Sequence, residues 1–473
     1  MKNRYLIFLP LLLIACNSND NIKEKKKFPT VAPPLHKSDL VINPHFHVSI
    51  VFSQGDTVYN SEGITAPAKG KHDCSVFIPD KNNTNKGTLF IGHETTKPND
   101  LLGDGGGATQ FLVERKGKDW VAVSEKESID FRTVGGTLAN CGGSYTPNKT
   151  ILSAEEIIPY SNKDIARFIT DLSDFNGRPK YQNFGWMVEI DPQKKAATQK
   201  LYQMGRYKHE DALCMPDNKT VYLTNDDSCA VFFKYVADKP KDYTQGQLYA
   251  YAYPNQWLAL PMAMDSLVNA REVAIRQGAS LFNRQEWISL VDGKIYITET
   301  GNDNNDWSKY IAMGGKPAPY FFELRKENGL FDDPHGRLLV FDPKTNEMEV
   351  LLQGGVAATD SSTVFSNPDG MGEFKIHGKN YLIICEDIIG KNRGRSVDPK
   401  TTVNEIYLLD LSIPKPTIED LKRLLIGPAG CEMSGPVFTP DGSTLFVNIQ
   451  HPSKENKVYN KSSTIAISGW DRL

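Results

Sequence analysis

Several features that would assign the chain to a common functional class are absent from its 473 residues. No two cysteines have the C-x-x-C spacing, which argues against a zinc cluster and against a thioredoxin-like redox site. There is no long basic run within the folded part, and the formal net charge is only -3, so composition gives no electrostatic basis for nucleic-acid binding. Long apolar patterns of period 3.6 are also scarce. The many glycines, prolines and aromatic residues that remain indicate an all-β protein rich in turns.

The N-terminus has a positively charged start and a short apolar run that ends at a cysteine. Lys2 and Arg4 precede the apolar residues 5–14, and Cys16 follows them. The run is too short to span a bilayer comfortably and is typical of a lipoprotein signal peptide. A plain signal peptide with an incidental cysteine is the alternative.

These N-terminal features predict the domain organisation and the location of the protein. We expect residues 1–15 to be a signal peptide, residues 16–40 a flexible tether lipidated at Cys16, and residues 41–473 one β-propeller domain. The protein is then an exported lipoprotein, anchored to a membrane on the periplasmic or outer surface.

From about residue 45 the chain repeats short strand patterns that are separated by turns. Residues 87–92, 219–224 and 293–298 each follow a turn and alternate β-branched or aromatic side chains. A second strand pattern often follows, which is typical of the blades of a β-propeller. We predict an all-β, six-bladed propeller with loop insertions over the central channel, near 96–130, 157–183, 238–283 and 302–335, and one amphipathic helix within 256–277. Two sandwich domains in tandem are the alternative.

Glutamates recur at wide intervals beside these strand patterns: Glu94, Glu155, Glu210, Glu286, Glu386 and Glu432. A radial fold would bring one acid per blade to the channel, where carboxylates repel one another unless they share protons or bind cations. Carboxylate oxygens suit Ca²⁺ above all. His93 and His209 each precede one of the acids, and one member of each pair should face away from the channel because neighbouring strand residues point in opposite directions.

An arginine accompanies one of these acids. Arg284 and Glu286 lie two residues apart on a predicted strand and therefore share a face. An arginine held beside metal-binding carboxylates is suited to grip a phosphate through two parallel hydrogen bonds. An Arg-Glu salt bridge on a solvated face is the alternative.

Three longer phrases, residues 140–156, 205–212 and 427–452, resemble the PhoX alkaline phosphatase family. Shorter matches at 92–94, 284–286 and 367–370 extend the resemblance over most of the mature chain in the expected order. The resemblance implies an exported six-bladed propeller that hydrolyses phosphomonoesters. It also implies calcium and iron ions held by carboxylates in the channel, with a bridging oxide or hydroxide that attacks phosphorus.

The resemblance assigns roles to particular residues of this chain. Glu155, Glu210 and Glu286 match metal ligands of the family, and Arg284 matches the arginine that grips the phosphate. The other matching positions that we assign to the metal site are Glu94, Asn140, Asp369 and Glu432, whereas Glu386 is expected to be peripheral. One departure concerns iron, because the family has a cysteine ligand directly before the paired glutamates, where this chain has Ala154. Calcium is therefore the expected metal, and the missing thiolate argues against Fe³⁺.

The sequence thus predicts an extracytoplasmic, metal-dependent phosphatase that acts on small phosphate esters as a monomer, with a membrane contact through its lipid and no nucleic-acid partner. Two other functions fit the same residues. One is a calcium-dependent propeller hydrolase of the lactonase or phosphotriesterase kind. The other is a non-catalytic binding lipoprotein with structural metals, which the absence of the cysteine at position 154 favours.

Overall fold

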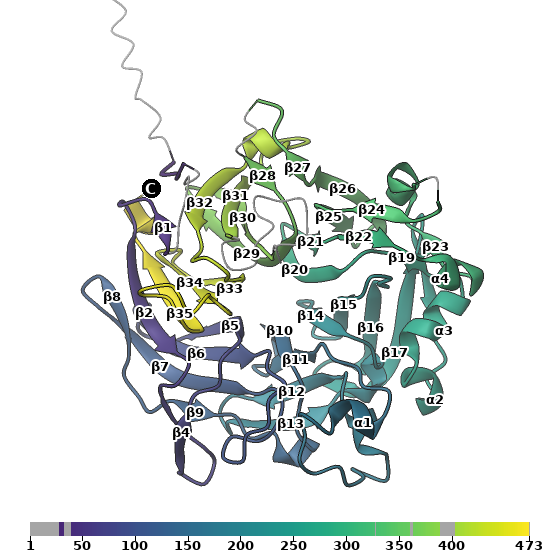
Figure 1. Cartoon of the computed structure of the whole chain (residues 1–473), viewed down its shortest axis with the longest axis horizontal. Helices are drawn as coiled ribbons and strands as arrows, with labels where there is room; N and C mark the ends of the chain where they lie inside the picture. The colour runs from purple at the N-terminus through teal and green to yellow at the C-terminus, as the bar shows by residue number, and fades with distance from the viewer. Residues whose placement is uncertain (1–27, 33–38, 327, 360–362, 388–402, 473) are drawn as a thin grey trace, which may run out of the picture.

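The strands form a ring of sheets around a central channel, as Figure 1 shows. This computed structural model describes residues 28–32, 39–326, 328–359, 363–387 and 403–472. Six of its sheets have four strands or more, and the innermost strand of each packs against the innermost strands of its two neighbours. The chain is therefore an all-β propeller, as predicted, and two sandwich domains in tandem are excluded.

The first three sheets follow one another along the chain. The first contains β5 (His72–Pro79), β6 (Lys86–His93), β7 (Ala108–Lys116) and β8 (Asp119–Ala122), with the short strands β3 (Thr57–Tyr59), β4 (Thr65–Pro67) and β9 (Glu127–Ser128). The second contains β10 (Asn140–Tyr145), β11 (Ile151–Glu155), β12 (Met187–Asp191) and β13 (Ala196–Lys200). The third contains β14 (His209–Cys214), β15 (Thr220–Asn225), β16 (Phe233–Lys239), β17 (Asp242–Ala252) and β18 (Gln256–Ala259).

Three more sheets follow, and the N-terminal segment adds an edge strand to the fifth and to the sixth. The fourth sheet contains β20 (Gln285–Val291), β21 (Lys294–Glu299), β25 (Arg337–Asp342) and β26 (Glu347–Gln353). The fifth contains β29 (Pro368–Ile376), β30 (Lys379–Glu386), β31 (Glu405–Asp410) and β32 (Lys422–Ile426), with β1 (Val41–Ile42) at its edge. The sixth contains β33 (Met433–Phe438), β34 (Thr444–Ile449) and β35 (Ser463–Ser468), with β2 (His47–Ser53) at its edge. The two ends of the chain thus close the ring together.

Short elements connect these strands. Three small two-stranded sheets pair β19 (Ser280–Leu281) with β23 (Lys316–Pro317), β22 (Asn302–Asn305) with β24 (Phe331–Asp333), and β27 (Gly355–Val356) with β28 (Val364–Phe365). The α-helices are α1 (Asn162–Ile165), α2 (Met264–Leu267), α3 (Ala270–Arg276) and α4 (Ser308–Ala312). The 3₁₀ turns are η1 (Arg132–Val134), η2 (Lys180–Asn183), η3 (Tyr202–Met204), η4 (Pro319–Leu324), η5 (Ile418–Asp420) and η6 (Trp470–Arg472).

Two local predictions need correction. Residues 96–130 were expected to be an insertion, but 108–116 and 119–122 are regular strands of the first sheet, and 96–107 is the longest irregular stretch. The helix expected within 256–277 is divided, because Gln256–Ala259 pairs with β17 as a strand and two short helices follow. Pro261 lies between the strand and the helices, and proline lacks the N–H that a continuous helix would need there.

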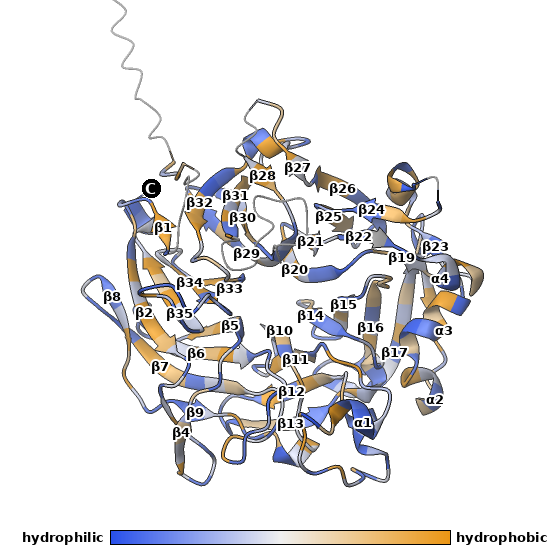
Figure 2. Cartoon of the chain, viewed as in Figure 1, coloured by the Kyte–Doolittle hydropathy of each residue, from blue (hydrophilic) through white to orange (hydrophobic). Residues whose placement is uncertain are grey.

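Apolar side chains fill the spaces between neighbouring sheets. One large cluster joins the second, third and fourth sheets around Tyr207, Phe233 and Phe282, and another joins the fifth and sixth sheets around Ile383 and Val447. In Figure 2 the apolar colour follows the strands around the ring, whereas the loops are mainly hydrophilic. Burial of both faces of each sheet explains why the strand patterns in the sequence contain so many aromatic and β-branched residues.

Every innermost strand has an irregularity near its start. In each of the six, the first or second residue pairs with the end of the second strand, and the register then shifts before pairing resumes. A bulge of this kind leaves a residue without a cross-strand partner and redirects its side chain. The repetition of the bulge around the ring is what brings polar side chains to one end of the channel.

The cysteines from Cys74 to Cys431 are all unpaired, although an exported setting would permit disulfides. Cys16 lies outside the described residues, as do the expected signal peptide and most of the tether. Within the part of the chain that the structure describes, no helix is long and apolar enough to cross a membrane.

Candidate metal centre at one mouth of the channel

Three positions in every blade point toward the end of the channel where the innermost strands begin, which we call the carboxylate mouth. The entry position directly precedes the innermost strand and is filled by Lys71, Ala139, Lys208, Arg284, Asn367 and Glu432. The inner position is the second residue of that strand and is filled by Asp73, Cys141, Glu210, Glu286, Asp369 and Ser434. The exit position directly follows the second strand and is filled by Glu94, Glu156, Asp226, Thr300, Asp387 and Gln450.

Backbone hydrogen bonds hold the entry and exit positions together within a blade. The N–H of the exit residue donates to the carbonyl of the entry residue in five of the six blades, for example from Glu156 to Ala139 at 3.1 Å and from Asp387 to Asn367 at 2.9 Å. Several entry residues have the left-handed backbone conformation, including Arg284 with a φ of 57°. This conformation is uncommon for residues with a side chain, and it persists only where the surrounding structure imposes it.

The carboxylates at the mouth outnumber the cations. The inner and exit positions contribute four carboxylates each and the entry position one, whereas only Lys71, Lys208 and Arg284 carry a permanent positive charge. Two groups of three carboxylates lie close enough to share an ion, Glu156 with Glu210 and Asp226, and Glu210 with Glu286 and Asp369. Glu210 therefore belongs to both groups and lies between them.

Burial and mutual repulsion change how these carboxyl groups ionise. Burial, followed by the charges of neighbouring carboxylates, raises the pKa of Glu156, Glu210 and Asp369 well above the ordinary range. Burial likewise raises the pKa of Asp387 to about 6. Carboxylates in such surroundings are stable as anions only when a cation compensates them.

Two observations show that the residues present fit a bound cation. Asp369 Oδ1 and Asp387 Oδ1 are buried and have no hydrogen-bond partner among the described residues. Buried anionic oxygens are normally paired, so these two atoms are suited to an ion. The donors in the two carboxylate groups are oxygens, which are the ligands that Ca²⁺ prefers.

Arg284 lies among these carboxylates, as the sequence predicts. Its Nε and Nη2 donate to the two carboxylate oxygens of Asp226 at 2.8 and 3.2 Å, and Nη2 also lies 2.9 Å from Glu286 Oε1. Asp387 is farther away, at 3.9 Å. The guanidinium is therefore held at the edge of the second carboxylate group, and not on a solvated face.

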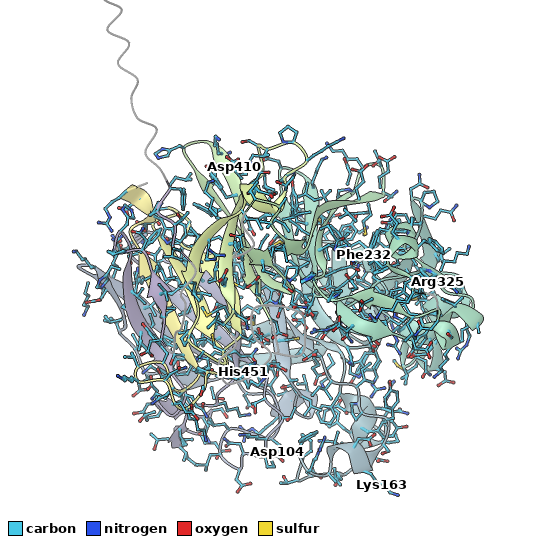
Figure 3. All side chains as sticks on the ribbon, turned by 45° about the horizontal axis from the view of Figure 1, so that its top comes forward. Asp104, Lys163, Phe232, Arg325, Asp410 and His451 are labelled. Atoms are coloured by element: carbon cyan, nitrogen blue, oxygen red, sulfur yellow. The ribbon has the colours of Figure 1, made fainter. Side chains whose placement is uncertain are left out.

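A third group at the mouth contains a histidine. Asp387, Glu432 and His451 lie close enough to share an ion, and Figure 3 labels His451 toward the middle of the molecule. His451 Nε2 is 3.2 Å from Glu432 Oε2, and Gln450 donates to Glu432 Oε1 at 3.0 Å. Burial alone would lower the pKa of His451, but the bond to Glu432 and its charge raise that pKa to about 9.

Glu155 is separated from these groups, and its neighbour Glu156 takes the channel position. Glu155 accepts hydrogen bonds from the backbone of Leu138 at 2.9 Å and of Trp186 at 3.1 Å, and it forms a buried ion pair with Lys200 at 2.9 Å. These bonds tie the second strand of the blade to the segments beside it. The predicted ligand Glu155 therefore lies outside the three groups, and its contacts hold the blade together.

In two other blades a glutamate at the end of the second strand makes similar hydrogen bonds to neighbouring backbone. Glu299 accepts from the backbone of Asn283 at 3.0 Å and pairs with Arg337 at 2.6 Å. Glu386 accepts from the backbone of Ser366 and of Glu405, each at 3.0 Å. Glu386 is thus buried and lies outside the three groups, in agreement with its expected peripheral role. In these three blades the last residue of the second strand bonds to neighbouring backbone, and the next residue faces the channel.

The other predicted ligands occupy different surroundings. The Asn140 side chain is buried and already bonded, because Oδ1 accepts from Gly107 N and Thr137 Oγ1 at 2.7 Å each and Nδ2 donates to Ser153. Glu94 is at the exit position and pairs with Lys71 at 3.1 Å, outside the three groups. Glu432 belongs to the group with His451, and Asp369 to the group with Glu210.

The two histidines lie away from the channel. His93 Nε2 is 2.9 Å from Thr109 Oγ1, and His209 Nε2 is 2.9 Å from the carbonyl of Gly205. Both side chains are buried in the blades, whereas the following acids, Glu94 and Glu210, take the exit and inner positions. The expected division of each His-Glu pair is therefore present.

A cysteine occupies one of the inner positions at the mouth. It is Cys141, and position 154, where the family has its cysteine, lies on a different strand. Ala154 lies in the second strand and packs with Leu152 and Met187 in the apolar cluster between sheets. Cys141 occupies the inner position, with Sγ 3.4 Å from the carbonyl of Glu210. Burial, then the charges of Glu210 and Glu156, raise the pKa of this thiol. The alanine therefore removes no donor from the inner positions of the ring.

Several mouth residues were not singled out by sequence reasoning: Asp73, Glu156, Cys141, Asp226, Asp387, Lys71, Lys208 and His451. Glu156 and Asp387 could have been found by strand parity, because each directly follows a glutamate that ends a strand. Asp226 also follows a strand end, but nothing in the residues 225–227 distinguishes it from Asp227.

Comparison with known proteins agrees with the fold and the motifs. The family model described as alkaline phosphatase PhoX matches residues 27–453. The structure of Pseudomonas fluorescens PhoX in complex with vanadate, a transition state analogue, is 20% identical and has a TM-score of 0.72, over 94% of this chain and 98% of that chain. No curated protein matches the sequence.

Other solved structures are more distant. The PQQ domain of a Coprinopsis cinerea pyranose dehydrogenase has a TM-score of 0.45 at 12% identity, over 92% of this chain and 98% of that chain. A Trypanosoma rangeli sialidase has a TM-score of 0.41 at 8% identity, over 90% of this chain and 59% of that chain. Because the family model matches nearly the whole chain, the protein belongs to the PhoX alkaline phosphatase family and is a phosphoric monoester hydrolase.

Proposed function

We propose that the protein is an extracytoplasmic phosphatase whose phosphomonoester substrate binds at the carboxylate mouth against metal ions. The observation that carries the proposal is the position of Arg284, which is gripped by Asp226 and lies 2.9 Å from Glu286 at the edge of a carboxylate group. Six sheets surround the channel, and we infer six blades from them.

The metal ligands that we propose follow from the three groups. Glu156, Glu210, Asp226, Glu286 and Asp369 would hold the ions nearest Arg284, and Asp387, Glu432 and His451 would hold a further ion. Their oxygen donors support Ca²⁺, and Cys141 supplies the softer donor that an iron ion would need. Bound metal ions would supply charge neutralisation for the phosphoryl oxygens and a reactive oxygen nucleophile.

The residues of the chain perform the binding and orientation. Arg284 uses Nε and Nη2 for Asp226, and we propose that Nη1 donates to a phosphoryl oxygen of the substrate. Asp226 and Glu286 fix the guanidinium plane, so little side-chain entropy is lost when the ester binds. Lys208, whose pKa is lowered by burial but raised overall by Asp226 and Asp227, adds positive charge beside the same group.

Location and assembly are proposed on separate grounds. The N-terminal pattern supports export and lipidation at Cys16, and the lipid would anchor the enzyme to a membrane on the periplasmic or outer surface. One chain contains all the proposed mouth residues, which supports activity of the monomer.

The test is phosphate release from p-nitrophenyl phosphate by protein purified without added metal, before and after treatment with EGTA. We expect release that EGTA abolishes and that Ca²⁺ restores, and elemental analysis should find calcium. Metal loading without release from any phosphomonoester would contradict the proposal and favour a binding lipoprotein. Turnover of lactones or phosphotriesters in place of monoesters would favour the second hydrolase class.

A further inference from the structure

The opposite end of the ring has a different charge. We call it the turn face, because the six turns that join the first and second strands of each blade lie there, at residues 80–85, 146–150, 215–219, 292–293, 377–378 and 439–443. Within two residues of these turns there are seven lysines, Lys81, Lys86, Lys149, Lys219, Lys294, Lys375 and Lys379, against four acids, Asp80, Asp217, Asp292 and Asp441. The six turns therefore carry more lysines than acids, and they remain net positive when Asp211 and Glu373, which line the funnel between them, are added, whereas carboxylates outnumber cations at the mouth.

Most of these lysines are free to meet a charged surface. Lys81, Lys149, Lys294 and Lys375 are exposed, and none of the four forms an ion pair with another described residue. Lys379 is exposed as well but pairs with Asp410 at 2.9 Å. The outer turns of the same face contain both signs, as in the pair Lys194 and Asp191, so the excess charge is concentrated near the channel.

The described chain also begins at the turn face. The ring of Phe28 packs 6.4 Å from that of Trp470, which in turn contacts Phe438 at the end of β33. Val31 N donates to the carbonyl of Arg423 at 3.0 Å, and Asn43, between β1 and β2, donates to the carbonyl of Thr30 at 3.1 Å. The end of β33 is where the turn to β34 begins, so these contacts fix the start of the fold on that face.

A lipid on Cys16 would be close to this point. Twelve residue steps separate Cys16 from Phe28, which reach about 40 Å when fully extended. This length is an upper limit on how far the lipid can lie from Phe28. The lipid is therefore expected nearer to the turn face than to the mouth.

We propose that the turn face rests on an anionic lipid surface and that the carboxylate mouth faces away from it into water. The proposal rests on the export and lipidation proposed above. Two signals act together, a covalent lipid at the correct face and a net positive surface around it, and such pairs give more stable membrane attachment than one acyl chain alone. The mouth lies at the opposite ends of the innermost strands and in this orientation faces the water. Its substrates are then water-soluble phosphate esters and not lipid headgroups in the anchoring membrane.

The orientation can be measured by energy transfer to a dye in the lipid headgroups. The full-length, lipidated protein is reconstituted in vesicles of phosphatidylcholine, with or without phosphatidylglycerol, and labelled with a donor at Lys294→Cys on the turn face or at Lys163→Cys in α1. Lys163 follows the mouth end of β11, is exposed, and is labelled at the edge of the ring in Figure 3. Protein without the added cysteine gives the background from Cys214, the half-buried native thiol.

We expect transfer from position 294 to exceed transfer from position 163 by about twofold or more in vesicles that contain phosphatidylglycerol, because an eight-residue strand separates the two faces by roughly 25 Å. Equal transfer from the two positions, or greater transfer from position 163, would overturn the proposal. So would mass spectrometry that finds no acyl group on Cys16.

Charge reversal separates the contribution of the lysines from that of the lipid. The triple variant Lys81→Glu, Lys149→Glu and Lys375→Glu should remove at least half of the difference between the two dye positions. The matched control is Lys309→Glu, Lys454→Glu and Lys457→Glu, three exposed lysines in connections at the mouth end that form no ion pair with described residues. It should leave the difference unchanged, and an equal effect of both triples would refute a specific role of the turn face.

Phosphatase activity is not part of this measurement. A protein that is oriented as expected but releases no phosphate would contradict the proposed function and leave the orientation standing. A protein that hydrolyses phosphomonoesters but shows no preferred orientation would do the reverse.

Discussion

The two ends of the same six innermost strands differ in how their charge is compensated. At the mouth, nine carboxylates face three permanent cations, and burial raises the pKa of several of them. At the turn face, lysines and aspartates lie in exposed turns, where water screens them. A funnel of about 560 Å³ opens there, lined by Trp287, Asp211 and Glu373 among others.

Buried carboxylates need a cation to compensate their charge, whereas exposed side chains are compensated by water and salt. The carboxylates of the mouth are buried in groups, so the protein alone leaves them repelling one another. The side chain of Glu373 reaches solvent in the funnel, and desolvation by the surrounding walls raises its pKa. The following predictions test whether function depends on the first end only.

The largest effect is expected for Glu210→Gln. Because Glu210 belongs to two carboxylate groups, the change should weaken two ion sites at once and lower kcat/KM by about 100-fold or more. Bound metal, measured by elemental analysis, should fall by at least one ion per chain. Normal metal content together with normal activity would show that the shared position of Glu210 has no functional meaning.

Arg284→Lys should lower kcat/KM by about 100-fold, because lysine cannot form two parallel hydrogen bonds to a phosphoryl group. Vanadate should also inhibit the variant less strongly than the wild type. Arg132→Lys, at a side chain that is 63% exposed, is the matched control and should leave both values unchanged. Equal kinetics for the two variants would remove Arg284 from the substrate site.

The adjacent pair Glu155→Gln and Glu156→Gln separates structure from function. Glu155→Gln breaks the buried ion pair with Lys200 and should lower the free energy of unfolding by about 3 kcal/mol, with a small effect on kcat. Glu156→Gln should act the other way, with a large loss of activity and little loss of stability. Urea unfolding and phosphate release measure the two properties, and the reverse assignment would restore Glu155 as a ligand.

Removal of metal should make stability depend on pH. In the metal-free protein, folding raises the pKa of Asp387 to about 6, and those of Glu156 and Glu210 also rise. A raised pKa stabilises the fold below the unfolded value near 4 and that contribution is lost as pH rises. The melting temperature with EDTA should therefore fall between about pH 4 and pH 6, and Ca²⁺ should suppress the fall. A flat profile with EDTA would contradict the repulsion argument.

The smallest effect is expected at the turn face. Glu373→Gln should change kcat/KM within about twofold, because the side chain is exposed and lies at the far end of the innermost strands. A loss comparable to that of Glu210→Gln would mean that the two ends of the channel act together.

Much of the architecture could be predicted from the sequence, because a sheet that is buried on both faces requires regular apolar strand patterns. Arg284, Glu210, Glu286 and Asp369 were singled out from family motifs beside strand starts, and the structure brings these four residues together. The position of Glu155, outside the three groups, could not be read from the sequence. A glutamate that ends a strand is as regular in sequence as one that faces the channel, and only the hydrogen bonds of the fold distinguish Glu155 from Glu156.

The remaining differences come from contacts between distant segments. Asn140 resembles a ligand in its motif, but its amide is bonded to Gly107 and Thr137, and neither bond is visible in a strand pattern. Whether the alanine at position 154 removes a metal ligand likewise depends on which strand lines the channel, and the sequence does not show that. Cys141, and not residue 154, has that place.

The closure of the ring by both ends of the chain has a consequence for how the protein is made. His47 in β2 pairs with Ser468 in β35, so the last sheet needs residues from the start and the end of the chain. Pairing over such a separation is slow, because the chain entropy of a very long loop must be lost first. During synthesis the N-terminal strand emerges first and stays unpaired until the last residues arrive. Deletion of β2 or of β35 should therefore lower the yield of folded protein more than it impairs the chemistry of molecules that do fold.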